Sequence, residues 1–315
     1  MRVIVVGMGV QGEKRRRVAG SSVVATVDPI LPADYKSIKD VPLDSFDAAL
    51  CCIPDAPKFD CLEYLLANKK HVLVEKPLYV ESKDQIKKLE ILARQHNVVC
   101  YTAYNHRFEP HFVTAKEIIE SEKLGKIYSC RMFYGNGTAR LVRDSAWRDQ
   151  GSGVIHDLGS HLLDTLLFFF GDSMKERQFS LRSCQRFENK SPDYAAFSSE
   201  EALPRLDCEM TMVSWRNSFY CDIYGEKGSL HIDTLCKWGP STLTFRERIL
   251  PSGKPSERSE TLLQPDPTWE TEYAYFKKLC ELKNRQEDLS KDLYLLEALQ
   301  SLEHQMTIKE PMYAI

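Results

Sequence analysis

The sequence VIVVGMGVQG at residues 3–12 decides the fold of the N-terminal part of the chain. Its first four residues are all apolar and β-branched and predict a buried strand, and the glycines that follow have the spacing G-x-G-x-x-G. Gly7 permits a tight turn, Gly9 lets the backbone approach a pyrophosphate, and Gly12 lets a helix pack close to the strand. The helix N-terminus then offers N–H groups to the phosphates. A purely structural glycine turn is the alternative. We expect a dinucleotide site formed by Gly7, Met8, Gly9, Val10, Gln11 and Gly12.

An acidic residue, Asp28, ends the second predicted strand. A carboxylate at this point binds the ribose hydroxyls of the adenosine and repels a 2′-phosphate, so NAD is favoured over NADP. Asp28 follows Gly12 somewhat sooner than the usual distance of about 20 residues. The short helix between them carries the basic run Lys14-Arg15-Arg16-Arg17. This run is either a solvated face of the helix or a contact for an anionic group of the cofactor or substrate.

Residues 1–105 alternate short apolar runs with helical patterns. Strands alternating with helices imply right-handed crossovers and a parallel sheet covered on both faces. We therefore expect an α/β Rossmann domain over residues 1–105. Its predicted strands are Val3–Val6, Val23–Val27, Ala48–Ile53, His71–Val74 and Val98–Thr102, and two of its predicted helices are Pro57–Ala67 and Ser82–His96.

The pattern changes after residue 105, and residues 106–315 predict an α+β domain with an open antiparallel sheet. The polar stretch Glu188–Pro204 predicts an exposed loop, and two helices close the chain. The helices expected near the start of this domain are Pro110–Glu122 and the strongly apolar Val154–Phe170. The strands expected here are Ile127–Tyr134, Phe179–Phe187, Leu206–Trp215, Phe219–Tyr224, Ser229–Asp233 and Ser241–Arg246.

Composition narrows the class of protein. The net charge is only −3, so nothing suggests a nucleic-acid partner or a membrane surface. The most apolar run, Leu162–Phe170, is far shorter than the roughly 20 residues that span a membrane. Ten scattered cysteines without a C-x-x-C pair favour buried thiols in a reducing compartment over disulfides or a metal site. No signal-peptide pattern follows Met1, so we expect a cytoplasmic protein.

A lysine follows the fourth predicted strand, in the sequence Glu75-Lys76-Pro77. A residue at the C-terminal end of a parallel strand lies in the crevice where such folds bind ligands. Pro77 fixes the local backbone. A lone lysine here would be read as an exposed side chain at the sheet edge. Together with the glycine fingerprint, it becomes a candidate for both cofactor and substrate contact.

Several motifs follow one another along the chain, namely the glycine fingerprint, Glu75-Lys76-Pro77, Asn105-His106-Arg107-Phe108, Trp147-Arg148 and Asp157-Leu158-Gly159-Ser160-His161. With these motifs the chain resembles the Gfo/Idh/MocA family (glucose–fructose oxidoreductase, inositol dehydrogenase and relatives) over roughly residues 1–232. Asp28 departs in spacing as noted, and Cys52-Ile53-Pro54-Asp55 replaces the Thr-Pro and nearby His of many relatives. The resemblance implies that Lys76, Asp157 and His161 carry the chemistry.

Further contacts are expected around these motifs. Cys52, Pro54, Glu75, Lys76 and Asn105 are candidates for the cofactor. Lys76, Arg107, Arg148, Asp157 and His161 are candidates for the substrate. Arg148 is equally well explained as a surface arginine that packs on Trp147. The family also implies an oligomer, so we expect a homodimer or homotetramer.

On an α-helix Asp157, His161 and Asp164 share one face. The plain alternative is a core histidine capped by Asp157. A metal held by His156, Asp157 and His161 is disfavoured, because adjacent side chains point in different directions and the ligands are few. We expect no metal.

The expected reaction is hydride transfer between a sugar-type hydroxyl and the nicotinamide. His161 would act as general base, Lys76 would stabilise the reacting oxygen, and Asp157 would orient the imidazole or hold a neighbouring hydroxyl. The substrate would be a sugar, a polyol or a nucleotide sugar, with the 3-hydroxyl of a UDP-sugar as one candidate. Two alternatives stay open, namely an NAD-dependent glycoside hydrolase of the same fold and a non-catalytic NAD-binding sensor.

Overall fold

The computed structural model describes residues 1–145, 148–282 and 288–308, and the chain divides into two compact units. The first unit contains Met1–Asn105 and Thr268–Glu297. The second contains His106–Pro267 and the described residues from Ala298 onward. The sequence placed the domain division after residue 105, where the first segment of the first unit ends. Thr268–Glu297, which the sequence assigned to a continuous second domain over 106–315, pack within the first unit.

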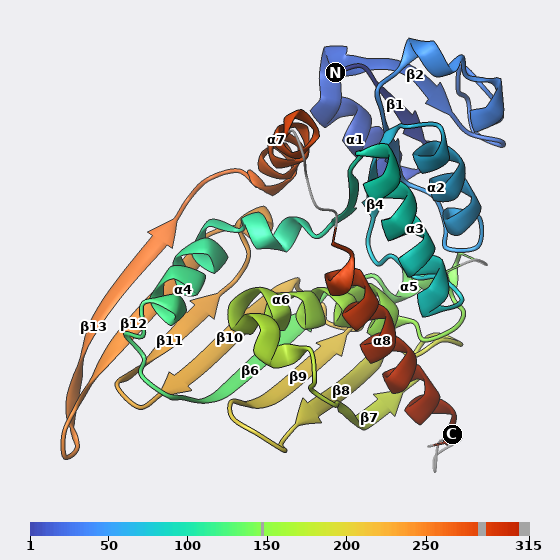
Figure 1. The fold of residues 1–315 in the computed structure, drawn as a ribbon. Helices are drawn as coiled ribbons and strands as arrows, with labels where there is room; N and C mark the ends of the chain where they lie inside the picture. Colours follow the sequence, from blue (N-terminus) through green and yellow to red (C-terminus); the bar gives the residue numbers. More distant parts are fainter. Residues whose placement is uncertain (146–147, 283–287, 309–315) are drawn as a thin grey trace. The chain divides into compact units, whose positions relative to one another are not determined.

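The first unit is built on a five-stranded parallel sheet in the order β2-β1-β3-β4-β5 (Figure 1). The predicted Rossmann sheet is confirmed. Strand β2 lies on one side of β1, and β3 lies on the other side. α/β sheets bind their ligands at such a point, where the strand order reverses direction. The strand bounds are β1 Val3–Val6, β2 Val23–Val27, β3 Ala48–Cys51, β4 His71–Glu75 and β5 Cys100–Ala103.

Helices cover both faces of this sheet. Strand β1 alternates between two apolar clusters: Ile4 and Val6 pack with residues of α2 and α3, whereas Val3 and Val5 pack with Phe276 of α7. Because a parallel sheet needs apolar cover on both faces, the late helix α7 completes the first unit beside α1. The helix bounds are α1 Val10–Ala19, α2 Lys58–Ala67, α3 Lys83–His96, α7 Thr268–Glu281 and α8 Ser290–Ile308, the last of which belongs to the first unit up to Glu297.

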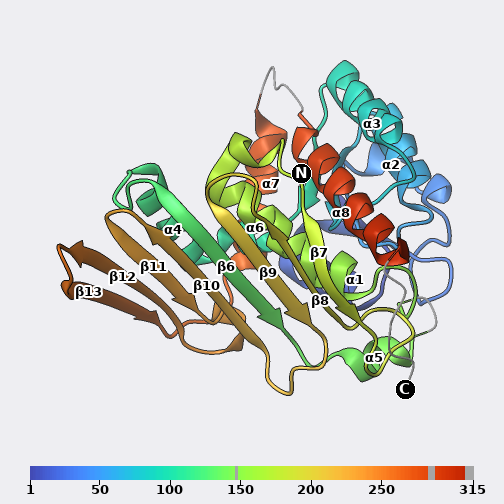
Figure 2. The same ribbon diagram turned by 90° about the horizontal axis from the view of Figure 1, so that it is seen from below.

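The second unit is built on an eight-stranded sheet in the order β13-β12-β11-β10-β6-β9-β8-β7, seen broadside in Figure 2. All neighbouring pairs are antiparallel except β6 and β9, which are parallel. The predicted open antiparallel sheet is therefore confirmed apart from this pair. The strand bounds are β6 Ile127–Gly135, β7 Ser180–Gln185, β8 Tyr194–Ser199, β9 Arg205–Thr211, β10 Ser218–Gly225, β11 Gly228–Asp233, β12 Ser241–Ile249 and β13 Gly253–Leu262.

The prediction that Glu188–Pro204 is an exposed loop is wrong, because this stretch contains strand β8, paired between β7 and β9. The buried side chain of Asp193 organises the turn that leads into β8. Its carboxylate accepts hydrogen bonds from the backbone N–H groups of residues 187, 188 and 189 at 2.9, 2.6 and 3.1 Å. Bonds of this kind satisfy a buried charge and order the backbone around it.

Helices α4 and α6 lie on one face of the eight-stranded sheet (Figure 1). Phe112 of α4 joins them to the sheet, since its ring centroid lies 5.4 Å from that of Phe169 in α6 and 5.3 Å from that of Phe219 in β10. Such aromatic contacts add to the burial of apolar surface that stabilises the layer. The helical bounds are α4 Pro110–Glu120, α5 Ala139–Arg143, a π-helical turn at Ile155–Gly159 and α6 Ser160–Phe170.

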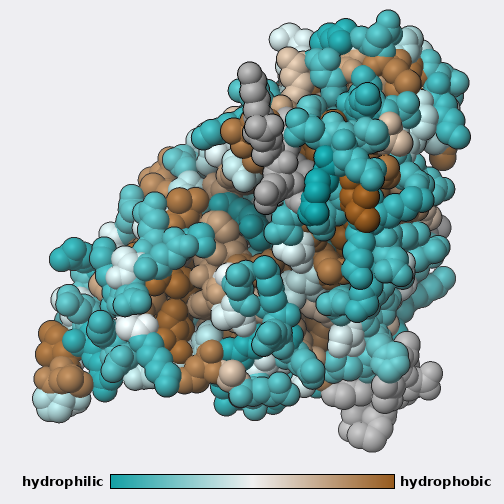
Figure 3. Space-filling view, in the orientation of Figure 1, coloured by the Kyte–Doolittle hydropathy of each residue, from teal (hydrophilic) through white to brown (hydrophobic). Residues whose placement is uncertain are grey.

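The surface of the face shown in Figure 3 is predominantly hydrophilic. Hydrophobic residues gather at the tip of the β12–β13 hairpin, where Ile249 and Leu250 are 47% and 70% exposed. None of the helices in the described parts of the chain is long and apolar enough to cross a membrane.

Candidate active site

The glycine loop of the first unit connects β1 to α1. Gly7 has a φ of +89°, and a Cβ there would lie 2.3 Å from the carbonyl oxygen of Cys52. A Cβ on Gly12 would lie 1.8 Å from the carbonyl oxygen of Gly7, so both positions require glycine within the protein itself. Gly9 differs, because a Cβ there would meet nothing within 4 Å. Its exposed backbone is therefore open to a ligand, as the fingerprint requires.

The first turn of α1 fits a pyrophosphate. Gly9 is the N-cap residue, and no side chain caps the helix. Val10 and Gln11 at its start are exposed, Val10 by 85%. The first N–H groups of a helix have no partners within it and carry a partial positive charge, so they suit the phosphates of a dinucleotide.

Asp28 ties the glycine loop to the end of β2. Its carboxylate accepts hydrogen bonds from the backbone N–H groups of Met8, Ile30 and Leu31 at 2.7, 2.8 and 2.7 Å. Burial raises the pKa of Asp28, but these three hydrogen bonds outweigh it and the net pKa lies below the ordinary value. Asp28 is thus an ionised anchor for the loop, a role that the sequence alone did not indicate.

The carbonyl groups on either side of Lys76 are held by a second lysine. Lys58 begins α2, its side chain is 2% exposed, and its Nζ donates to the carbonyl oxygens of Pro77 at 2.7 Å and Glu75 at 3.3 Å. Asp55 balances the charge at 2.6 Å. The Lys76–Pro77 peptide bond is cis, and Lys76 itself is half-buried. Lys58 therefore holds the backbone from which the Lys76 side chain extends.

Arg15 is buried, unlike the solvated helix face that was one interpretation of the basic run Lys14-Arg15-Arg16-Arg17. Its side chain is 1% exposed, with Nε 2.6 Å from Glu75 Oε1 and Nη2 2.7 Å from Glu272 Oε2. Its guanidinium also lies over the ring of Trp269 at 4.2 Å. Burial raises the pKa of Glu272 to about 7, although Arg15 opposes the shift. The expected cofactor residue Glu75 is thus bound to α1 and, through Arg15, linked to α7.

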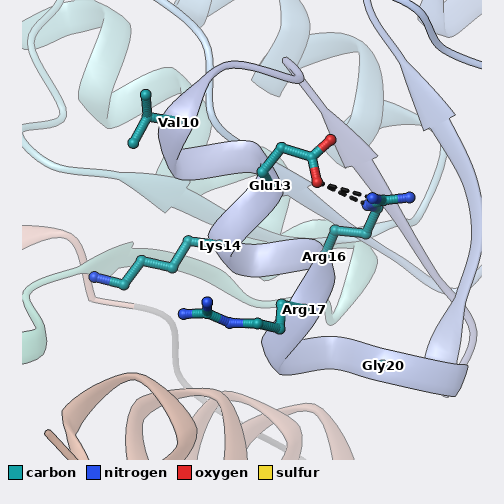
Figure 4. A pocket seen from close by; sticks show the side chains of 6 residues that line it. All are labelled: Val10, Glu13, Lys14, Arg16, Arg17 and Gly20. Atoms are coloured by element: carbon teal, nitrogen blue, oxygen red, sulfur yellow. Dashed lines mark hydrogen bonds and ion pairs between the residues drawn. The ribbon is translucent and has the colours of Figure 1, made fainter.

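The other members of the basic run lie at the surface. An open pocket of about 700 Å³ runs along α1, and in Figure 4 Lys14 and Arg17 extend to one side of the helix while Glu13 pairs with Arg16. Lys14 lies over the ring of Trp269 at 3.9 Å. The solvated-face interpretation therefore fits Arg16 and Arg17, both exposed, and not Arg15.

The remaining cofactor candidates of the first unit have different surroundings. Asn105 is 8% exposed and its Nδ2 donates to Thr268 Oγ1 at 2.8 Å, which links the segment after β5 to the start of α7. Cys52 is half-buried after β3, and burial raises the pKa of its thiol well above the ordinary value. Pro54 is exposed. These residues border the C-terminal end of the sheet as expected, and their contact with a cofactor stays a prediction.

In the second unit His161 stacks on a second histidine. The rings of His161 and His106 are 4.0 Å apart between centroids and inclined by 20°. His161 is 8% and His106 2% exposed, and the Tyr134 ring lies 5.9 and 5.5 Å from the two rings. The sequence placed His161 in a buried helix. It included His106 in a family motif without giving it a role, and His106 lies within the short helical turn η4, Asn105–Phe108.

Asp157 lies in the π-helical turn that precedes α6. A π turn holds more residues than an α turn, so the α-helical spacing that put Asp157 and His161 on one face does not apply across it. Asp157 is 35% exposed, and its Oδ2 lies 3.6 Å from Nη2 of Arg148, a salt bridge longer than a hydrogen bond. Arg148 thus faces Asp157, whereas Trp147 lies outside the described residues. No group of three potential metal ligands occurs among the described residues.

Arg107 is engaged by the helix that carries His161. Its Nε and Nη2 donate to the carboxylate of Asp164 at 2.7 to 3.0 Å, and Asp164 is 1% exposed. This bidentate pair satisfies a buried carboxylate and fixes η4 against α6. Arg107, expected to bind substrate, therefore has a structural role that holds His106 and His161 in their stack.

Models of known protein families match a segment in each of the two units. Residues 5–104 match the family described as "Oxidoreductase family, NAD-binding Rossmann fold", and residues 112–231 match the "GFO/IDH/MocA C-terminal domain". Both matches belong to one family of oxidoreductases, whose N-terminal domain is described as an NAD-binding Rossmann fold. The chain belongs to the Gfo/Idh/MocA family of oxidoreductases.

Several relatives and solved structures are similar to the chain. An uncharacterized oxidoreductase of Schizosaccharomyces pombe is 32% identical over 44% of this chain and 37% of its own length. Glucose-6-phosphate 3-dehydrogenase of Bacillus subtilis is 29% identical over 43% of this chain and 40% of its own length. The chain thus matches about two fifths of these curated relatives. Levoglucosan dehydrogenase in complex with NADH has the same fold, with a TM-score of 0.79, 16% identity and 98% of both chains covered.

Glu272 gives stability a dependence on pH. Its pKa is about 7 in the folded chain against an ordinary 4.5, so between these values the folded chain binds more protons than the unfolded chain. The free energy of unfolding should therefore fall as pH rises from 5 to 8, relative to Glu272→Gln, by on the order of 1–3 kcal/mol. Urea unfolding of both proteins at several pH values measures this. A difference that stays flat or grows with pH contradicts it.

We expect alanine substitutions at Gly9 and Gly12 to have different effects. Gly9→Ala should leave the melting temperature nearly unchanged and weaken NAD binding at least about tenfold, because its Cβ meets no protein atom but would occupy the path of the pyrophosphate. Gly12→Ala should lower the melting temperature, because its Cβ overlaps the Gly7 carbonyl. Calorimetric titration with NAD and thermal unfolding test both. If Gly9→Ala binds NAD as tightly as the wild-type protein, the glycine loop is not part of the cofactor site.

Proposed function

We propose that the protein is an NAD-dependent dehydrogenase that acts on a CH–OH group of a sugar-type substrate. The observation that carries this proposal is His161, a nearly buried histidine stacked on His106 in a chain whose other unit is an NAD-binding Rossmann fold. A histidine near neutral pKa is the side chain best suited to take up a hydroxyl proton. The preference for NAD over NADP rests on the charge of Asp28.

Each proposed catalytic residue has a separate role. Bound NAD⁺ supplies the acceptor for the hydride. The carbinol carbon of the substrate becomes a carbonyl carbon, and the proton of the substrate hydroxyl passes to His161. Lys76 donates a hydrogen bond to the same oxygen and stabilises the negative charge that develops on it. Asp157 orients the imidazole of His161 or holds a neighbouring hydroxyl of the substrate. Arg148, 3.6 Å from Asp157, also contacts the substrate.

The substrate class rests on the relatives. One relative is named as a dehydrogenase that acts at position 3 of glucose 6-phosphate, and one structure with the same fold is a levoglucosan dehydrogenase. We propose a sugar, a polyol or a nucleotide sugar, with the 3-hydroxyl of a UDP-sugar as a specific candidate. Assembly into a homodimer or homotetramer in the cytoplasm, which the sequence suggested, stays part of the proposal.

A screen of sugars, polyols, sugar phosphates and nucleotide sugars with NAD⁺ and NADP⁺, followed at 340 nm, tests the function. At least one substrate should reduce NAD⁺, and NADP⁺ should react more slowly. Release of a reducing sugar without net reduction of NAD⁺ would indicate the hydrolase alternative instead. Binding of NAD without turnover of any compound would favour the sensor.

Variants of the proposed catalytic residues test their roles once a substrate is known. His161→Gln should lower kcat by about 10²–10⁴-fold, the range typical of general-base catalysis, with little change in substrate binding. Lys76→Ala should lower kcat strongly and leave the Kd for NAD nearly unchanged. His96→Gln, in α3 of the first unit, is the matched control and should keep full activity. A His161→Gln enzyme with normal turnover would remove His161 from the mechanism.

A further inference from the structure

Lys237 lies among the aromatic and titratable groups that surround the stacked histidines. It belongs to the short helical turn η7, Cys236–Trp238, after β11. Its Nζ donates to the hydroxyl of Tyr134 at 3.0 Å and lies 3.4 Å from Nε2 of His106. The same ammonium lies 4.5 Å from the ring centroid of Trp238 and 5.4 Å from that of Tyr134. No motif in the sequence pointed to this lysine.

Lys237 is partly desolvated and faces several acids. Burial lowers its pKa, while the nearby carboxylates Glu109, Asp266 and Asp157 oppose this shift without cancelling it. Glu109 is itself 1% exposed, accepts the backbone N–H of Cys236 at 3.1 Å, and has a pKa that burial raises. The lysine is therefore held by its surroundings rather than extended into solvent.

The contact between Lys237 and His106 restricts the charge of the stacked pair. An ammonium group has three donors and no acceptor, so Nε2 of His106 must offer its lone pair and the ring hydrogen must lie on Nδ1. This is the neutral form of the imidazole. A proton added to either stacked ring would place a second positive charge close to Lys237, which is unfavourable at such short range.

We propose that Lys237 is a positioning residue for His161. By fixing His106 as a neutral imidazole it keeps the neighbouring ring, His161, in the neutral form that accepts a proton. The role of His161 as base rests on the proposed function, whereas the effect of Lys237 on the charge of the histidine pair does not.

The groups around the pair act in both directions. Lys237 disfavours a proton on the histidines, and the carboxylates in this region favour one. Arg148 offsets Asp157, and Arg107 offsets Asp164. Among the described residues of this unit, the charged and titratable groups that surround Lys237 or belong to the segments carrying the two histidines include Glu109, Tyr134, Arg107, Arg148, Asp157, Asp164 and Asp266.

A histidine titration followed by NMR tests the proposal without turnover. The full chain is labelled in its histidine rings, and the signals of the pair are assigned with His106→Gln and His161→Gln. Lys237→Met should raise the pH midpoint of protonation of the pair by about half to one unit, because it removes a like charge. Lys237→Arg keeps the charge and should restore the wild-type midpoint. Lys254→Met, at an exposed site in β13, is the control and should change nothing.

The pH dependence of turnover gives a second readout. In Lys237→Met the acidic limb of kcat/KM should move to higher pH by the same amount, which a merely structural role would not produce. If Lys237→Met fails to fold, Lys237→Gln carries the same expectation. An unchanged or lower midpoint in the neutral variants would overturn the proposal. A shifted midpoint in a chain that reduces no NAD⁺ would uphold the role of Lys237 and reject the proposed function.

Discussion

Two buried cations fix the end of β4, and the arrangement of the first unit depends on them. Arg15 binds the Glu75 carboxylate, and Lys58 binds the carbonyl oxygens on both sides of Lys76. Both cations are almost fully buried, so each must keep its partners, because an uncompensated buried charge costs several kcal/mol. The position of the Lys76 backbone is therefore set by charge pairing inside the protein and not by the strand alone.

The same principle organises the second unit. There the Arg107–Asp164 pair joins η4 to α6, and it thereby holds the ring of His106 against that of His161. Lys237 also contacts the pair, through His106, and donates to the hydroxyl of Tyr134. Each unit thus presents a residue of the proposed mechanism on a backbone that buried ion pairs hold in place. Such support is what preorganised catalytic groups require.

The sequence was sufficient for the class of fold because the relevant signals are local. The glycine fingerprint after β1 and the apolar strands can each be recognised from a few consecutive residues. Steric demands at Gly7 and Gly12 leave little choice of residue there. The partners of buried charges are not local. Arg15 lies in a run of four basic residues that looks solvated, and its second partner, Glu272, follows it by more than 250 residues. Lysine side chains are mostly exposed in folded proteins, so no sequence pattern indicated that Lys58 and Lys237 would be held inside the protein by polar partners. Strand β8 was missed because its pairing with β7 and β9 overrides a polar composition.

A crystal structure of the protein with NAD and a bound substrate or unreactive substrate analogue is the decisive measurement for the proposed mechanism. We expect Nζ of Lys76 and a ring nitrogen of His161 both to lie within hydrogen-bonding distance of one substrate oxygen. We also expect the pyrophosphate to contact the backbone at Gly9. A ligand bound with either side chain out of reach of that oxygen would contradict the proposed mechanism.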